Sequence, residues 1–310
     1  MAKVFIDGSA GTTGLRIYER LESRKDIEFI RLSEEKRKDI SARKAALNSA
    51  DIAFLCLPDD AARESVSFAE NTDTVIIDTS TAHRTDPEWA YGFPELSPER
   101  EKQIASSKRI AVPGCHASGF IALVYPLAEA GILPKTARLS CFSLTGYSGG
   151  GKKMIAEYEA ENRDVLLSAP RQYGIAQSHK HLPEMQAVTG LENAPVFIPV
   201  VADFYSGMEV TVPLFVSELI GGAGTEDIIN IYKNKYCGPV VSFRDEPYEN
   251  GFVSAGKLSD RDSMEISVAG NGERILLVAR YDNLGKGASG AAIECMNISL
   301  GTDKTKGLEL

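Results

Sequence analysis

One cysteine and two histidines are the residues with the clearest potential for chemistry. Cys115 lies in the segment PGCHASG, between a Pro-Gly turn and an apolar run that is predicted to be helical. A thiol at the start of a helix lies near the positive end of the helix dipole, which favours the thiolate. The segment SHKHLPE places His179 and His181 just before Pro183, a residue suited to the first turn of a helix. Imidazole in that position tends to stay neutral and can act as a base, so the two segments predict covalent catalysis.

The remaining cysteines indicate no disulfide framework and no zinc site. The chain has five cysteines with no C-x-x-C pair, which favours a reducing, cytoplasmic environment. Four of them are expected to be inert: Cys56, Cys141 and Cys295 in apolar stretches, and Cys237 in a segment without visible chemistry. The spacing of His179 and His181 would also suit a metal. No third His or Cys with ligand spacing lies nearby, so no metal is expected.

A glycine-rich loop near the start of the chain predicts a dinucleotide site. A short apolar run ends at the loop, and a predicted helix follows it. Glycines allow a tight turn and a close approach of the backbone to a pyrophosphate, which then faces the helix N-terminus. The alternative is a glycine-rich turn without a ligand, and the strand-loop-helix context favours the cofactor. The loop residues are Gly8, Ser9, Ala10, Gly11, Thr12, Thr13 and Gly14.

The end of the second predicted strand, residues 28–32, favours NADP(H) over NAD(H). A carboxylate there would accept a hydrogen bond from the ribose 2'-hydroxyl. Here Ser33 follows the strand and a basic run, Lys36, Arg37 and Lys38, comes shortly after, which suits a 2'-phosphate. The intervening Glu34 and Glu35 weaken this prediction, and the basic run would otherwise be a solvated helix face.

The order of the predicted elements indicates an α/β protein with two domains. Residues 1–114 alternate short apolar strands with helices, which predicts a Rossmann-type parallel sheet. Residues 115–285 are rich in longer strands, which predicts an α+β domain of mostly antiparallel sheet that carries catalysis and oligomerisation. A C-terminal helical segment, 286–310, is expected to rejoin the first domain, with a tail after residue 301 that frays.

Two further turns are candidates for contacts with a substrate. The first is a rigid turn that includes Glu95 and could line a pocket. The second contains Ser148 and Gly149, continues to Lys152, and could form an anion-binding nest of backbone N–H groups. Either turn could instead be a loop without a ligand.

Composition excludes several functional classes. The net charge is -9 for 310 residues, which argues against nucleic acid as a partner. No apolar run is long enough for a membrane span, and no signal peptide is expected.

Taken in order, these motifs resemble the N-acetyl-γ-glutamyl-phosphate reductase family of arginine biosynthesis, in its shorter form. The resemblance covers almost the whole chain. It rests on six segments: GSAGTTG, YGFPE, PGC, SGGGK, HKHLPE and DNLGKGA, which begin at residues 8, 91, 113, 148, 179 and 282.

The resemblance implies an NADPH-dependent enzyme that reduces an acyl phosphate to a semialdehyde through a cysteine thioester and releases inorganic phosphate. It implies that Cys115 is the nucleophile, that His181 is the acid/base, and that Asn283 approaches the nicotinamide carboxamide. His179 and Glu184 would lie in the substrate site, and the enzyme would be a homo-oligomer, a dimer or a tetramer. Longer family members carry an arginine where this chain reads FYSGM from residue 204, so Arg84 and Lys152 become candidates for the substrate carboxylate.

Three alternatives remain open at this point. The first is a related acyl-phosphate reductase such as aspartate-semialdehyde dehydrogenase. The second is a non-catalytic NADP-sensing protein, which would have no use for both Cys115 and His181. The third is a cysteine hydrolase, which would have no use for the glycine loop.

Overall fold

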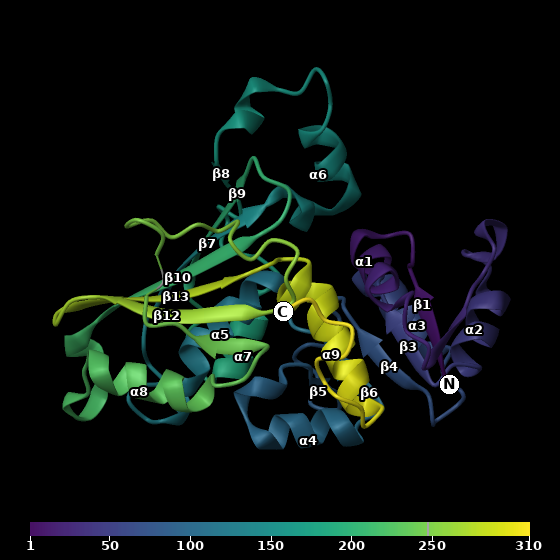
Figure 1. Ribbon diagram of the computed structural model, residues 1–310, viewed down its shortest axis with the longest axis horizontal. Coiled ribbons are helices and arrows are strands. Elements are labelled where there is room, and N and C mark those ends of the chain that lie inside the picture. The colour runs from purple at the N-terminus through teal and green to yellow at the C-terminus, as the bar shows by residue number, and fades with distance from the viewer. Residues whose placement is uncertain (247) are drawn as a thin grey trace. The chain divides into compact units, whose positions relative to one another are not determined.

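The computed structural model describes residues 1–246 and 248–310, and the chain forms two compact units (Figure 1). Unit 1 comprises residues 1–114 and 288–308, and unit 2 comprises residues 115–287 and 309–310. Each unit is built on one sheet, and the predicted fold class is confirmed.

Unit 1 contains a six-stranded sheet in which every pairing is parallel. The strand order is β2-β1-β3-β4-β6-β5. The strands are β1 (Ala2–Asp7), β2 (Ile27–Ile30), β3 (Ile52–Leu55), β4 (Val75–Asp78), β5 (Ala90–Tyr91) and β6 (Arg109–Ala111). The helices are α1 (Thr12–Leu21), α2 (Ile40–Asn48), α3 (Asp59–Ser67), α4 (Pro98–Ser106) and α9 (Gly290–Ser299).

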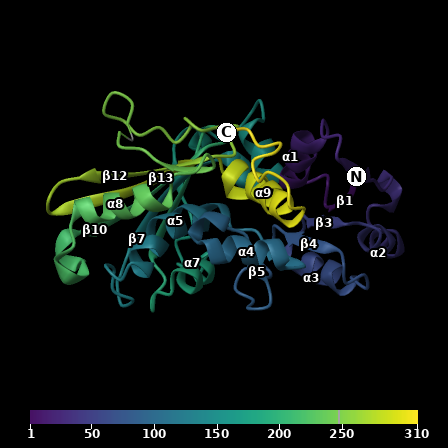
Figure 2. The ribbon, with the colours of Figure 1, turned by 60° about the horizontal axis from the view of Figure 1, so that its bottom comes forward.

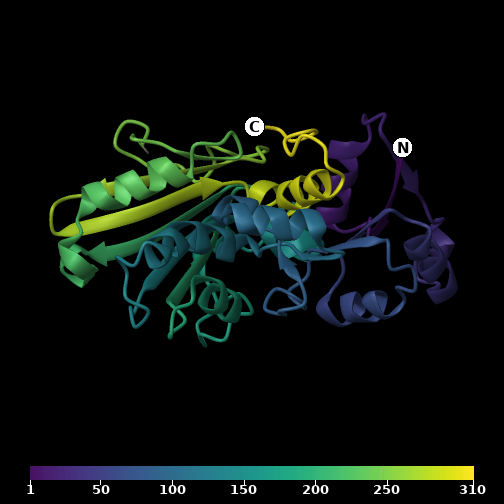
Figure 3. The same ribbon diagram turned by 90° about the horizontal axis from the view of Figure 1, so that it is seen from below.

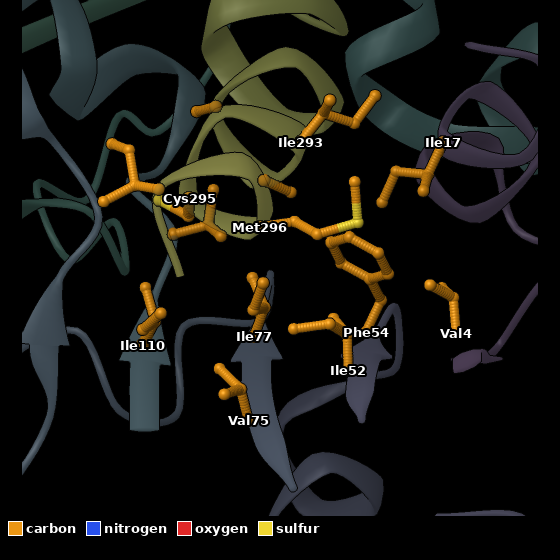
Figure 4. Close-up of a cluster of buried hydrophobic side chains, with 14 of the residues drawn as sticks. Val4, Ile17, Ile52, Phe54, Val75, Ile77, Ile110, Ile293, Cys295 and Met296 are labelled. Atoms are coloured by element: carbon orange, nitrogen blue, oxygen red, sulfur yellow. The ribbon is translucent and has the colours of Figure 1, made fainter. Parts of the chain in front are cut away.

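Helices cover both faces of this sheet because the strand side chains alternate between two apolar clusters. In β3, Ile52 and Phe54 point to one face, where they pack with Ile17 of α1 and Met296 of α9 (Figure 4). Ala53 and Leu55 belong to the second cluster, which includes residues of α2 and α3. A sheet buried on both faces explains why these strands read as continuous apolar runs.

The C-terminal segment, 286–310, is helical in its first part, as expected, but its tail differs from the prediction. A short π-helix over Gly285–Ser289 leads into α9, which lies beside α1 and α4 (Figure 3) and ends at Ser299. Gly301 follows with a φ of +64°, a conformation that ends helices. The tail is anchored rather than frayed, because Asn297 Nδ2 donates to the carbonyl oxygens of Lys304 and Lys306 at 3.0 and 2.9 Å.

Unit 2 contains a seven-stranded mixed sheet of order β11-β12-β13-β10-β7-β9-β8. Four of the six pairings are antiparallel, while β11 with β12 and β7 with β9 are parallel. The strands are β7 (Ser140–Gly146), β8 (Arg171–Gln172), β9 (Val196–Ala202), β10 (Met208–Phe215), β11 (Val241–Phe243), β12 (Met264–Gly270) and β13 (Arg274–Tyr281).

Helix α5 (Cys115–Glu129) is the central helix of unit 2. It is apolar on nearly all sides, which suits a helix buried between a sheet and other helices. It packs on β10 and β13 and contacts α7 (Leu182–Thr189) and α8 (Thr225–Lys235), which runs along β12 (Figure 2). A fourth helix, α6 (Gly151–Tyr158), follows the second glycine-rich turn. The sheet therefore fixes the first turn of α5, where Cys115 lies.

Candidate active site

The glycine loop in unit 1 forms a backbone cradle that side chains would fill. A Cβ at Gly8 would lie 2.2 Å from the carbonyl oxygen of Cys56, and one at Gly14 would lie 2.6 Å from the carbonyl oxygen of Gly8. Gly8 also has a φ of +88°, which L-residues rarely adopt. Helix α1 begins directly after Gly11, and no side chain caps it. Its first N–H groups therefore offer an anion site that fits the pyrophosphate of a dinucleotide.

The carboxylate before this loop is held in a buried ion pair. Asp7, the last residue of β1, lies 3.0 Å from Arg43 Nη2 and accepts a hydrogen bond from Ser65 Oγ at 2.7 Å. Burial disfavours the charged form of Arg43 and so lowers its pKa. The hydrogen bond and the attraction to Asp7 outweigh burial and leave the pKa of the guanidinium raised. The pair joins α2 and α3 to the end of β1 and thereby fixes the base of the loop.

The residues predicted to recognise the 2'-phosphate lie at the surface of unit 1. Ser33 is exposed and precedes a 3₁₀ turn over Glu34–Lys36. Lys36 is exposed, whereas the guanidinium of Arg37 forms an ion pair with Glu34. Glu34 thus neutralises part of the basic run.

Arg84 also lies in unit 1, and its guanidinium binds the main chain. Nε donates to the carbonyl oxygen of Val112 and Nη2 donates to that of Thr79, both at 2.9 Å. The side chain is buried. Arg84 therefore holds together the loops after β4 and β6. Glu95, half-buried, lies in a 3₁₀ turn over Pro94–Leu96 of the same unit.

Cys115 is the first residue of α5, and Tyr281 and Gly287 lie next to it. Tyr281 Oη donates to the carbonyl oxygen of Cys115 at 2.5 Å. A Cβ at Gly287 would lie 3.1 Å from Cys115 Cβ, closer than nearly all real contacts of that kind. The cysteine is half-buried, and its thiol lies at the helix terminus that favours a thiolate.

Three histidine rings gather next to this helix start. The ring centroids of His179 and His181 are 4.7 Å apart, and those of His116 and His181 are 5.6 Å apart. The backbone N–H of His181 donates to His179 Nδ1 at 3.2 Å, so a neutral His179 carries its proton on Nε2. His181 precedes α7 and is buried. The fold thus brings both predicted histidines beside the residue that follows Cys115.

His116 points into the protein and is neutral at physiological pH. Its Nδ1 lies 2.7 Å from Ser143 Oγ, and its Nε2 lies 2.6 Å from Tyr173 Oη. Burial, with a smaller contribution from His179, lowers the pKa of His116 to about 3. Burial is also the main cause that raises the pKa of Tyr173, and the charge of Cys115 adds to it.

Asn283 ties the end of β13 to the second glycine-rich turn. Its Nδ2 donates to Ser148 Oγ at 2.9 Å, and its Oδ1 accepts from the N–H of Gly207 at 3.0 Å. The side chains of Asn283 and Ser148 are both buried. This hydrogen-bonded connection positions the turn in unit 2.

The second glycine-rich turn has an open end. The N–H of Ser148 donates to the carbonyl oxygen of Tyr205 at 3.0 Å. Gly149 and Lys152 are exposed, and Gly151 has a φ of +71° with nothing within 4 Å of a Cβ placed there. The backbone N–H before Gly149 is therefore used in a hydrogen bond within the protein, while the segment that follows is open to a ligand.

Sequence reasoning gave no role to several residues around Cys115 and His116: Tyr173, Phe197, Tyr281 and Gly287. Tyr173 lies 57 positions from His116, and nothing in the sequence signals that separation. The sequence gave a weak indication that Tyr281 lies near the site, because this residue ends an alternating strand just before the segment DNLGKGA.

The predicted site residues fall into two groups by unit. Cys115, His179, His181 and the buried Glu184 lie in unit 2, with Ser148, Gly149, Lys152 and Asn283. The glycine loop, Ser33, Lys36, Arg37, Arg84 and Glu95 lie in unit 1. Within the described part of the chain, no group of three potential ligands is arranged to hold a metal ion. No helix among residues 1–246 and 248–310 has the length and apolar character needed to cross a membrane.

Two family models match the chain, one in each unit. Residues 3–104 match the NAD-binding domain of semialdehyde dehydrogenases, and residues 115–283 match the semialdehyde dehydrogenase dimerisation domain. The first match contains the glycine loop, and the second begins at Cys115.

Solved structures share the fold. Aspartate semialdehyde dehydrogenase II of Vibrio cholerae, complexed with ASA, superposes with a TM-score of 0.74 at 16% identity, over 97% of this chain and 98% of that one. The Candida albicans aspartate semialdehyde dehydrogenase with NADP has a TM-score of 0.66 at 14% identity, over 96% of this chain and 98% of that one.

Curated relatives are similar over nearly their whole length. N-acetyl-γ-glutamyl-phosphate reductase of Trichormus variabilis is 43% identical over 99% of both chains. The Sinorhizobium medicae enzyme of that name is 44% identical over 96% of this chain and 98% of its own, and the Brucella ovis enzyme is 45% identical over 96% and 99%. With a cysteine at a buried helix start and a cradle for a dinucleotide, the chain belongs to the N-acetyl-γ-glutamyl-phosphate reductases, a family of semialdehyde dehydrogenase oxidoreductases.

Proposed function

We propose that this chain uses NADPH to reduce N-acetyl-γ-glutamyl phosphate to N-acetylglutamate 5-semialdehyde and phosphate, a step of arginine biosynthesis. The observation that carries the proposal is Cys115 at the start of α5, with His179 and His181 gathered around the ring of its chain neighbour His116. The relatives that are 43–45% identical carry the name of this activity.

Cys115 is the proposed nucleophile. Its thiolate attacks the acyl carbon, the bond from that carbon to the phosphate oxygen breaks, and phosphate leaves with the bonding electrons. A thioester remains on Sγ. Backbone N–H groups in the first turn of α5 stabilise the negative charge that develops on the carbonyl oxygen.

His181 is the proposed acid/base. After the thioester is reduced, the C–S bond of the hemithioacetal breaks, its electrons return to Cys115 Sγ, and the semialdehyde is released. His181 exchanges the proton at the hemithioacetal oxygen. Its ring lies 5.6 Å from that of His116, the neighbour of the nucleophile, which supports this role.

The cradle at Gly8, Gly11 and Gly14 is the proposed binding place of the cofactor pyrophosphate, and Ser33 and Lys36 that of the 2'-phosphate. When bound, NADPH supplies the hydride that reduces the thioester. The residues of the chain hold the dinucleotide and orient it; Asn283 is the proposed partner of the carboxamide. Its amide already binds Ser148 and Gly207, which fixes its orientation.

The polar groups proposed to hold the substrate are of two kinds. The exposed turn with Gly149 and Lys152 is the proposed site of the transferred phosphate, and its open backbone and ammonium group support this assignment. The other proposed contacts are Arg84, Glu95, Ser148, His179 and Glu184, with Arg84 and Lys152 as candidates for the carboxylate.

Aspartate-semialdehyde dehydrogenase is the second candidate, supported by the shared fold. At 14–16% identity that likeness concerns the fold alone, whereas the relatives at 43–45% identity favour the N-acetylated substrate. A dinucleotide sensor without catalysis would not need a cysteine at a helix start with a histidine pair beside the residue that follows it.

We also propose a homo-oligomer, which the matched dimerisation domain supports. One face of the unit 2 sheet lies away from α5 and exposes Phe215 and Leu276, which are 54% and 44% exposed. Apolar residues exposed together on a sheet face are typical of protein interfaces. Five cysteines that form no disulfide favour the reducing cytoplasm as the place where the enzyme works.

A rapid-mixing experiment in the oxidative direction tests the proposed mechanism. Without phosphate, enzyme mixed with N-acetylglutamate semialdehyde and NADP should release at most about one NADPH per active site and then slow, because the thioester has no acceptor. Phosphate or arsenate should restore steady turnover. Steady production without phosphate would contradict the acyl-phosphate mechanism.

Two comparisons complete the test. Cys115→Ser should give no burst and yet bind NADPH, while Cys237→Ser, at an exposed cysteine, should behave as the parent enzyme. Aspartate semialdehyde in place of the N-acetylated substrate should react poorly; equal turnover would favour the second candidate.

A further inference from the structure

The hydroxyl of Tyr281 lies within the first turn of helix α5. The N–H of Gly119 donates to Tyr281 Oη at 3.0 Å, and Oη donates to the carbonyl oxygen of Cys115 at 2.5 Å. In a regular helix the N–H of residue 119 would donate directly to the carbonyl of residue 115. Tyr281 therefore hydrogen-bonds to both groups of this first turn, the Gly119 N–H and the Cys115 carbonyl.

The surroundings leave room for this arrangement only when residue 119 is glycine. A Cβ at Gly119 would lie 2.7 Å from Tyr281 Oη and 2.6 Å from Val210 Cγ2. Tyr281 is fully buried, and burial raises the pKa of its hydroxyl well above the usual value. The hydroxyl thus keeps its proton and donates to Cys115 over the whole working pH range.

The hydrogen bond from Tyr281 to the Cys115 carbonyl acts on the surroundings of the thiol through one planar peptide group. The carbonyl of Cys115 and the N–H of His116 belong to the same plane, so fixing the direction of the carbonyl also fixes that of the N–H. That N–H is among the groups at the helix start that can stabilise a thiolate or an oxyanion. The orientation of the Cys115 backbone also sets the direction of its Cα–Cβ bond.

The segment that follows Tyr281 also packs against Cys115, through Gly287. Gly287, whose N–H donates to the carbonyl oxygen of Asp282 at 3.0 Å, leaves only 3.1 Å between a Cβ of its own and Cys115 Cβ. The Asp282 carboxylate accepts from Ser206 Oγ and from the N–H of Leu284, at 2.8 and 2.6 Å. This bonding makes residues 281–287 a stiff support.

We propose that Tyr281 is a positioning residue for the reaction. Its hydroxyl lies between the Cys115 carbonyl and the Gly119 amide, and it orients the Cys115 thiolate and the adjacent N–H groups. The inference rests on the proposed role of Cys115 as nucleophile. Without the hydroxyl, the Cys115 carbonyl loses the donor that fixes its direction, so Sγ and the His116 N–H are less precisely placed.

The test compares Tyr281→Phe with Tyr236→Phe. Tyr236 is an apt control because it is also buried and its hydroxyl also donates to a carbonyl of α5, that of Ala122, at 2.7 Å, two turns beyond Cys115. Tyr281→Phe should lower kcat about ten- to a hundredfold with KM changed less than about twofold, because misplacement of reacting atoms acts on the transition state. Tyr236→Phe should keep kcat within about twofold of the parent.

A second readout follows the thiol without any turnover. Iodoacetamide alkylation of the Cys115 peptide, measured by mass spectrometry across pH in a Cys237→Ser background, reports the thiolate directly. In Tyr281→Phe the midpoint should move to higher pH, since a thiolate that loses aligned N–H donors is less stable. A loss of stability alone would leave this midpoint in place.

Gly119→Ala supplies an independent variant, because its methyl group displaces the hydroxyl without removing it; it should shift the midpoint in the same direction. Circular dichroism identifies the folded variants to be compared. Unchanged kcat and midpoint in folded Tyr281→Phe, or equal losses in Tyr236→Phe, would overturn the inference. Turnover by Cys115→Ser would instead overturn the proposed function, so the two failures are distinguishable.

Discussion

His116 Nε2 lies 2.6 Å from the hydroxyl oxygen of Tyr173, so the residue that follows Cys115 in the chain points away from solvent and into unit 2. The contact leaves His179 and His181 as the histidines of the cluster available for proton transfer, and His181 is the one proposed for it. The contact also buries an imidazole that the fold holds in its neutral form, so protonation of His116 is unfavourable in the folded state.

The His116 environment predicts a loss of stability in acid. Burial lowers its pKa in the folded state to about 3 from 6.5, so between these values the unfolded chain binds a proton that the folded chain does not. Stability contributed by the neutral ring is present above pH 6.5 and is lost as pH falls towards 3. Thermal unfolding at pH 7 and pH 4.5 should therefore show a larger drop in Tm for the parent than for His116→Gln. An equal drop in both proteins would assign the acid sensitivity to other groups.

His181→Asn should lower kcat about a hundredfold or more with a smaller change in KM, because proton transfer is felt in the transition state. His179→Asn is the matched control, since His179 is two residues away and its Nδ1 accepts the His181 N–H. Its loss in kcat should be smaller. Steady-state kinetics of both variants decide between them, and a larger loss in His179→Asn would reverse the assignment.

Ser33→Asp should shift the cofactor preference from NADPH towards NADH. A carboxylate repels a 2'-phosphate and can accept from a 2'-hydroxyl, while Asp still suits the position before the turn that Ser33 begins. The ratio of kcat/KM for the two cofactors should fall at least about tenfold. Ser33→Asn, similar in size but uncharged, should change the ratio much less. If neither variant changes it, the discriminating contact lies elsewhere.

Gly287→Ala should reduce kcat, because the new methyl group would lie 3.1 Å from Cys115 Cβ and push the cysteine from its place. A displacement near the reacting atom lowers the rate by about tenfold or more. Gly272→Ala is the control: no atom lies within 4 Å of a Cβ there, and the residue is in the same unit. Kinetics and alkylation of Cys115 should both distinguish the variants; full activity in Gly287→Ala would mean that the cysteine tolerates the shift.

Arg43→Met should destabilise the protein by about 3–5 kcal/mol, the range for removing one partner of a buried ion pair. Asp7 and the side chain of Arg43 are 4% and 9% exposed, so the carboxylate would lose its buried partner. Arg63→Met removes a pair with Asp60 in which the side chains are 55% and 104% exposed, and should cost less than about 1 kcal/mol. Urea unfolding measures both. NADPH binding should also weaken in Arg43→Met only, since Asp7 precedes the glycine loop. Similar unfolding curves for the two variants would show that the buried pair contributes little.

Local sequence determined the parts of this protein that depend on neighbours in the chain. Runs such as Ile52–Leu55, with both faces apolar, predict buried parallel strands, and the strand-glycine-helix order predicts the cradle at Gly8. A cysteine after Pro-Gly at the start of an apolar helix gave the candidate nucleophile. The helix near the C-terminus was also predicted, but the tail after it was expected to fray, whereas Asn297 anchors it.

Only the tertiary structure decided which distant groups meet at the site. Tyr281 is 166 positions from Cys115 and Tyr173 is 57 from His116, yet each pair is joined by a hydrogen bond. Sheet register placed Tyr281 at the end of β13 beneath the start of α5, and side-chain packing selected its hydroxyl as the bridge in the first turn. Periodicity and spacing describe which face a residue occupies, whereas the partner on that face depends on how strands and helices pack across the whole unit.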